Sequence, residues 1–176
     1  VSGNMFYGGT EYAAYVQVFE PDSIQITGNT FDRGVQALYL YVYRSGINDG
    51  LNVENNIFKN FASDTDRNVI RMVTYYLTAT SLIQYNSFIN NSVDSVIYIE
   101  RSASVGVLDN IFDNQGSTYD LKTFTAQYEG ETMYARRNWW GSAELSDIGG
   151  RIYDQSDDPK LVAVDFKPFR TTVDGT

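Results

Sequence analysis

The chain has 176 residues, a net charge of −9 and a sequence pI near 4.4, which fits one domain and disfavours nucleic-acid binding. It contains no cysteine and no histidine, so disulfides are excluded and the usual metal ligand and general base are missing. No apolar run approaches the length of a transmembrane helix, while 43% hydrophobic residues suffice for a core.

One pattern recurs along the chain: alternating aliphatic residues, a turn residue, an asparagine, one further residue and an aromatic residue. The aligned asparagines, in chain order, are Asn4, Asn29, Asn56, Asn86, Asn110 and Asn138. They recur at intervals of 25, 27, 30, 24 and 28 residues. A period in the twenties without helical patterning is typical of a stacked solenoid.

The residue before each aligned asparagine predicts a sharp corner. These residues are Gly3, Gly28, Asn55, Tyr85, Asp109 and Arg137. Four of the six are glycine, asparagine or aspartate, the types that accept a left-handed backbone. Each copy therefore predicts a strand, a one-residue left-handed corner and a second strand. We expect the asparagine amides to form a ladder from coil to coil, and the aligned aromatic residues to stack in the core.

Between the corners, alternating sequences predict one longer strand in each turn. These strands span residues 13–19, 37–43, 69–76, 96–100 and 121–128. The pattern predicts an all-β fold, a right-handed parallel β-helix of about six coils. Few prolines and the lack of a helix-forming run agree with this prediction. An antiparallel sandwich with Asn-rich turns is the alternative.

The sixth copy continues differently and predicts a C-terminal cap. Asn138-Trp139-Trp140-Gly141 is followed by Arg-Ile-Tyr-Asp at 151–154, Asp-Asp-Pro at 157–159 and a closing strand at 161–169. An open β-helix end exposes strand edges, so we expect Trp139 and Trp140 to be largely buried in a capping coil. We expect one domain over residues 1–176, with repeats in 1–137 and the cap in 138–176. Because residue 1 falls within a repeat, we expect the chain to be excised from a longer protein.

The cap sequence in residues 138–169, with its Asn-Trp-Trp-Gly and Val-Asp-Phe-x-Pro-Phe runs, resembles the terminal coil of pectate-lyase-like β-helix repeat domains. Among these it is most similar to the extracellular β-helix units of metazoan bark beetle (Anakonda) proteins. Those are single-pass membrane proteins of tricellular junctions. The resemblance implies an extracellular, non-catalytic adhesion or recognition unit that binds another protein or a copy of itself. A polysaccharide lyase or epimerase-like domain, or a carbohydrate-binding β-helix, is the alternative.

Candidate catalytic and metal-ligating residues are few. A lyase of this fold would use acidic calcium ligands and a basic residue beside a uronate, for which Asp64, Asp66, Arg67 and Arg71 are the candidates. A solvated loop is the simpler explanation, and we expect no catalytic residue, metal or cofactor.

In the cap, Asp157 and Asp158 are expected to form a structural turn. Arg136 and Arg137 are expected to pair with Asp147 or Asp154, or to stack on Trp139. The sequon Asn90-Asn91-Ser92 would carry a glycan at Asn90 if the parent protein is secreted.

The strongest functional signal is aromatic. In residues 37–43, strict alternation places Leu38, Leu40 and Val42 on one face of the strand and three tyrosines on the other. The outward set reads Tyr15, Gln17, Phe19, Tyr39, Tyr41, Tyr43, Arg71, Val73, Tyr75 and Tyr98. In register, these residues would form a flat patch that binds a protein or a glycan, with candidate binding residues Tyr15, Phe19, Tyr39, Tyr41, Tyr43 and Tyr75. A covering loop or domain, or inverted faces, is the alternative.

Overall fold

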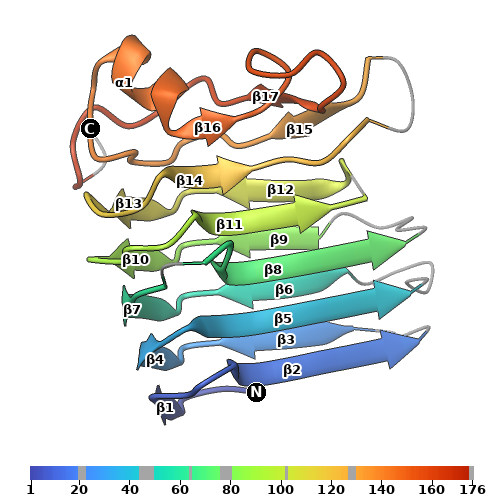
Figure 1. Cartoon of the computed structure of the whole chain (residues 1–176), viewed down its shortest axis with the longest axis vertical. Helices are drawn as coiled ribbons and strands as arrows, with labels where there is room; N and C mark the ends of the chain where they lie inside the picture. The colour runs from blue at the N-terminus through green and yellow to red at the C-terminus, as the bar shows by residue number, and fades with distance from the viewer. Residues whose placement is uncertain are drawn as a thin grey trace.

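The computed structural model describes residues 1–19, 23–43, 50–63, 65–75, 81–101, 103–126 and 130–174. These residues form a right-handed parallel β-helix of about five turns, with the sixth asparagine copy opening the cap. The coils stack along the long axis of the molecule, from the N-terminal coil to the cap at the other end (Figure 1).

Three stacked sheets build the coil. One contains β1 (Met5–Tyr7), β4 (Thr30–Gly34), β7 (Ile57–Phe61), β10 (Ser87–Ile89) and β13 (Ile111–Asp113). A second contains β3 (Ile24–Thr27), β6 (Leu51–Glu54), β9 (Ser81–Gln84) and β12 (Val105–Leu108). The third, here called the long-strand sheet, contains β2 (Tyr12–Phe19), β5 (Gln36–Tyr43), β8 (Asn68–Tyr75), β11 (Ser95–Glu100), β14 (Tyr119–Lys122) and β16 (Ile152–Tyr153).

Neighbouring coils pair in parallel. Ile24 lies opposite Leu51 and Ile26 opposite Val53, so the antiparallel sandwich is excluded. Side chains alternate between the core and the outer face, as the sequence predicts: Leu38 and Leu40 are fully buried in β5. The patch residues therefore lie on the outer face of the long-strand sheet, which faces the viewer in Figure 1.

All six predicted corners are confirmed. The residue before each aligned asparagine has a positive φ between 55° and 66°, including Tyr85 and Arg137, which rarely adopt this conformation. Inside the corners, the asparagines form the predicted ladder. The backbone N–H and Nδ2 of Asn56 both donate to Oδ1 of Asn86, at 2.9 and 3.0 Å, and the pattern repeats at Asn29, Asn86 and Asn110.

The aligned aromatic residues form one continuous stack through the core. Its members are Phe6, Phe31, Phe58, Phe88, Phe112 and Trp140. Successive ring centroids lie 4.7–5.0 Å apart and no pair is tilted by more than 9°. This spacing equals the separation of parallel strands, so the stack follows directly from the sheet register.

A second corner was not predicted. Arg33, Asn60 and Asn90 also have positive φ values of 67°, 61° and 53°, each four residues after a ladder asparagine. Beyond this corner, Asn91 and Asn114 form a second, shorter ladder, with Asn91 Nδ2 donating to Asn114 Oδ1 at 2.8 Å. Both amides are buried, so these hydrogen bonds satisfy polar groups that would otherwise be costly.

The cap consists of β15 (Thr132–Tyr134), α1 (Leu145–Gly150), β16 and β17 (Ala163–Asp165), with β15 pairing β17 and β16 extending the long-strand sheet. The helix α1 was not predicted. Trp140 is fully buried as expected, but Trp139 is only partly buried because Trp140 takes the aromatic-stack position. Among the described residues, no helix has the length and apolar character to cross a membrane.

The strand predicted at 121–128 is much shorter than expected. It ends at Lys122, and Thr125 instead bridges antiparallel to Leu161 of the cap. Residues 127 and 128 of that prediction lie outside the described residues. The chain leaves the long-strand sheet here because it contributes to the cap, and the edge of β11 beyond Tyr98 has no strand partner on this side among the described residues.

Candidate functional site

The register of the long-strand sheet aligns six outward side chains in a single row along the helix axis. This axial row consists of Tyr15, Tyr39, Arg71, Tyr98, Lys122 and Tyr153. Each member comes from a different strand, so residues spread over most of the chain become immediate neighbours. Aromatic side chains occupy both ends of the row, and the two cations are separated by Tyr98.

The members of the axial row stack on one another. The rings of Tyr15 and Tyr39 are nearly parallel, with centroids 5.2 Å apart. The Arg71 guanidinium lies 5.4 Å from the Tyr39 ring centroid and 5.8 Å from that of Tyr98. Lys122 Nζ lies 5.9 Å from the Tyr98 centroid and 5.6 Å from that of Tyr153. These are cation–π distances, so neighbouring side chains occupy the ring faces along the row.

Beside the axial row lies a second group, here called the tyrosine cluster: Phe19, Tyr41, Tyr43 and Tyr75. Tyr75 contacts both Tyr41 and Tyr43 with centroids 5.7 Å apart, and Phe19 lies 6.0 Å from Tyr43. The Arg101 guanidinium lies 4.7 Å from the Tyr75 centroid. The structure thus brings the predicted patch residues together on one face.

The patch is accessible at several points. Phe19 is 65% exposed, Tyr15 51% and Tyr43 38%, whereas Tyr39, Tyr41 and Tyr75 are partly buried. Burial raises the pKa of the Tyr39 and Tyr41 phenols above the usual range, so their hydroxyls are neutral hydrogen-bonding groups at physiological pH. Val73 was expected in the outward set but is only 4% exposed, so it adds no useful contact surface.

The charges on this face are paired. Arg71 Nε donates to Glu100 Oε1 at 2.6 Å, and Lys122 Nζ lies 3.0 Å from Asp94 Oδ2. Burial alone would lower the pKa of Lys122, but the hydrogen bond to Asp94 and the attraction of nearby acidic groups, Asp94 foremost, together outweigh burial and raise the pKa. Both cations are therefore held in fixed positions between aromatic rings.

Where β14 ends early, the face is hollowed. This depression, here called the Glu100 pocket, has a volume of about 350 Å³. It is lined by Tyr98, Glu100, Arg101, Phe124, Thr125 and Ala126. Phe124 is only 6% exposed and provides apolar surface, while Glu100 and Arg101 provide charge. The pocket adjoins the axial row through Tyr98, a connection that the sequence did not reveal.

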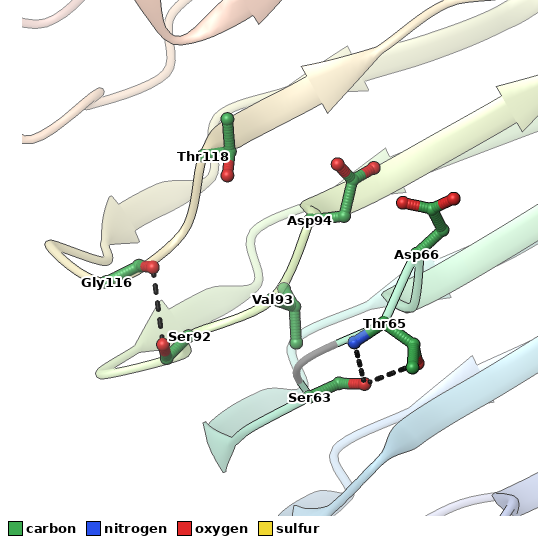
Figure 2. A pocket seen from close by; sticks show the side chains of 8 residues that line it. All are labelled: Ser63, Thr65, Asp66, Ser92, Val93, Asp94, Gly116 and Thr118. Atoms are coloured by element: carbon green, nitrogen blue, oxygen red, sulfur yellow. Dashed lines mark hydrogen bonds between the residues drawn. The ribbon is translucent and has the colours of Figure 1, made fainter.

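Of the lyase candidates that the structure describes, Asp66 and Arg71 have different surroundings. A polar groove of about 230 Å³ contains Asp66 and Asp94, whose carboxylates project the same way from neighbouring coils (Figure 2). Ser63 and Thr65 hydrogen-bond to each other beside them. Asp64 lies outside the described residues, and in the described part of the chain no three acidic, cysteine or histidine side chains are grouped to hold a metal ion. Arg71 belongs instead to the axial row.

The arginines before the cap tryptophans pair differently from the prediction. Arg136 pairs with Asp165 and lies 4.6 Å from the Tyr134 centroid, while Arg137 pairs with Asp109. Neither partner is Asp147 or Asp154, nor is Trp139 the stacking surface. The reason is the coil register: Asp109 and Arg137 hold the same corner position in successive coils.

The remaining predicted residues have structural contacts. Asp157 Oδ2 accepts from the Asp154 backbone N–H at 3.1 Å and Asp158 Oδ1 accepts from that of Lys160 at 3.0 Å, so both shape the expected turn. Gly141 follows the tryptophans with φ of 76°. Asn90 is exposed, and its Nδ2 donates to Asn60 Oδ1 at 2.9 Å.

Sequence reasoning missed Lys122 and Tyr153, although both belong to the axial row. The distance from an aligned asparagine to the next row member differs between coils, since Lys122 follows Asn110 by twelve residues and Tyr153 follows Asn138 by fifteen. Alternation within a strand is readable from the sequence, but the cross-strand partner is not. Only the register of β14 and β16 identifies these two residues.

Fold and surface together define a parallel β-helix domain with an aromatic and cationic outer face. No family model matches the chain, and no solved structure matches it. The chain is similar to Protein bark beetle of Drosophila melanogaster, with 30% identity over 122 residues. The alignment covers 60% of this chain and 4% of that protein, so the chain corresponds to a small part of its relative.

Proposed function

We propose that this chain is a non-catalytic, extracellular recognition unit of a cell-surface membrane protein at cell junctions. It binds a protein partner through the outer face of the long-strand sheet. The observation that carries the proposal is the continuous axial row with its adjoining tyrosine cluster. Tyrosine and arginine are the residue types enriched at protein interfaces, since they combine large contact area with hydrogen-bonding groups. The similarity to Protein bark beetle supports the proposed location at cell junctions.

The stacking geometry favours a protein over a glycan. Sugar rings bind aromatic side chains by lying on an open ring face. The Tyr39 ring instead has Tyr15 on one side, 5.2 Å away, and the Arg71 guanidinium 5.4 Å from its centroid. At Tyr39, the ring edge and the hydroxyl remain accessible, and these suit side-chain packing and hydrogen bonds from a protein.

The contacts of Arg71 support a non-catalytic role. Its guanidinium is held in place by Glu100 and lies against two tyrosine rings, so protein groups rather than a substrate occupy its surroundings. A proton-abstracting arginine would need the neutral form in contact with substrate. The test is incubation with polygalacturonate. We expect no unsaturated product, whereas cleavage that disappears in Arg71→Ala would establish the lyase alternative.

Binding is tested with the triple variant Tyr39→Ser/Tyr41→Ser/Tyr43→Ser, measured by interferometry against a panel of purified junction-protein ectodomains. Central aromatic anchors each contribute about 2 kcal/mol to binding, so the triple variant should lose detectable binding. Folding should persist because Leu38, Leu40 and Val42 on the opposite face remain in the core.

The matched control is Tyr85→Asn, which removes an exposed tyrosine from a corner outside the patch. It should bind as the wild type does, and thermal unfolding should show that the triple variant is folded. Unchanged binding by a folded triple variant would contradict the assignment of this face.

A further inference from the structure

We propose that the protein partner is a second copy of this chain, bound face to face through the long-strand sheet with its coils running in the opposite direction. This rests on the proposed function of that face. The two-fold axis runs parallel to the strands, between β8 and β11. It places β2 opposite β16, β5 opposite β14 and β8 opposite β11 of the second copy, because these are symmetric positions in the six-stranded order.

The axial row is complementary to its own reverse. When the rows of two copies face each other in opposite directions, Tyr15 of one copy lies opposite Tyr153 of the other. Likewise, Tyr39 lies opposite Lys122, and Arg71 lies opposite Tyr98. Each cation of one copy therefore faces a tyrosine of the other, and no cation faces a cation. Because the ring faces along the row are already occupied, each such pair brings a cation to a tyrosine hydroxyl, which can accept its hydrogen bond. No isolated charge is buried, since Arg71 and Lys122 retain Glu100 and Asp94.

The shapes of the two halves of the face also correspond. The tyrosine cluster exposes Phe19 of β2 and Tyr43 of β5, whereas the Glu100 pocket is a depression beside β11 where β14 ends. In the antiparallel arrangement, Tyr43 of one copy lies over this pocket of the other. The pocket offers Phe124 for the ring, and Glu100 and Arg101 as charged groups within the same lining. Tyr43 is 38% exposed and is thus available for such a contact.

The area of the face indicates how tightly two copies should bind. Strands about 4.8 Å apart and about 3.3 Å per residue give the face roughly 600 Å² per copy, allowing for the short β14 and β16. The total of roughly 1,200 Å² is at the lower limit of specific interfaces. We therefore expect a weak, concentration-dependent dimer, with a dissociation constant of about 10–100 μM.

The test uses the full chain, whose lack of cysteine makes any introduced thiol unique. Tyr39→Cys and Lys122→Cys chains are mixed and treated with a thiol-specific crosslinker that reaches about 10 Å, the distance between facing sheets. The proposal predicts a Tyr39→Cys/Lys122→Cys heterodimer. Either variant alone should crosslink poorly, because identical positions are offset by three strands, or about 14 Å along the axis. Tyr85→Cys mixed with Lys122→Cys is the matched control and should remain uncrosslinked.

Sedimentation equilibrium separates this proposal from the proposed function. The wild type should approach the dimer mass as its concentration rises, and Tyr43→Ser should raise the dissociation constant at least tenfold. A chain that stays monomeric, or crosslinks equally through Tyr39→Cys alone, overturns the antiparallel pairing. If such a chain still binds a junction ectodomain through its tyrosines, the proposed function stands. Self-association unaffected by the triple serine variant also overturns the proposed pairing, because it places the self-association on another surface.

Discussion

The asparagine ladder gives the most quantitative prediction. Asn86, at its middle, is 1% exposed and its side chain makes four hydrogen bonds. Its Oδ1 accepts from the backbone N–H and the Nδ2 of Asn56, at 2.9 and 3.0 Å. Its Nδ2 donates to the carbonyl of Val53 at 2.8 Å and to Oδ1 of Asn110 at 3.0 Å. The substitution Asn86→Ala removes all four.

The expected loss of folding free energy depends on which hydrogen bonds the partners of Asn86 keep in the variant. Asn56 Nδ2 still donates to the carbonyl of Ile26, and Asn110 Oδ1 still accepts from the backbone of residue 86. The backbone N–H of Asn56, however, loses its acceptor while buried. Four hydrogen bonds at about 0.5–1 kcal/mol each, together with about 1–3 kcal/mol for one buried unpaired donor, give a loss of about 3–7 kcal/mol.

The control is Asn4→Ala in the same ladder. Asn4 lies at the exposed end, where its Nδ2 donates to the carbonyl of Ser2 at 2.6 Å and to Oδ1 of Asn29 at 3.3 Å, and water can replace both contacts. We expect this variant to lose less than about 1 kcal/mol. Urea unfolding followed by circular dichroism measures both. Equal destabilisation by the two variants would refute the view that buried coil-to-coil amide bonds hold the stack together.

Three further predictions concern single sites. Arg151→Ala should cost about 3–5 kcal/mol in urea unfolding, because it leaves the fully buried Asp120 without its cation, and Asp120→Asn in the same chain should restore part of the loss. Tyr85→Asn should stabilise the fold by about 0.5–1 kcal/mol, because asparagine tolerates the left-handed φ of 56°, and a lower melting temperature would contradict this. The hydrogen bond from Arg136 lowers the pKa of Asp165 in the folded protein. The ionised Asp165 therefore stabilises the fold at pH values above the ordinary carboxyl pKa, and this stabilisation is lost as the pH falls through the folded pKa. In Arg136→Gln, a carboxyl titration by NMR should show a higher pKa for Asp165.

The repeated elements were readable from the sequence because each depends on a local conformational preference repeated at similar spacing. A left-handed residue, an asparagine and an aromatic residue in fixed order predicted the corners, the ladder and the core stack. Even Tyr85 and Arg137, poor residues for positive φ, were placed correctly by alignment with the other copies. Here hydrogen bonds to neighbouring coils outweigh the local preference.

The sequence correctly predicted which residues of β5 point outward, but it did not predict which residues of neighbouring strands lie beside them. Alternation identified Tyr39, Tyr41 and Tyr43 as outward because side chains in a strand point to opposite faces with period two. It could not show that Val73 would be buried or that β14 would stop at Lys122. Both depend on what neighbouring coils and the cap place beside these residues.

The sequence by itself determined the parallel β-helix, its corners and its buried and outward faces, because these follow from residue type and short-range spacing. Tertiary structure decided which outward residues became neighbours. The intervals between aligned asparagines range from 24 to 30 residues, so sequence distance does not specify the register of the long strands. Backbone hydrogen bonds between coils set that register. They bring Arg71, Tyr98, Lys122 and Tyr153 into one row and form the pocket beside it.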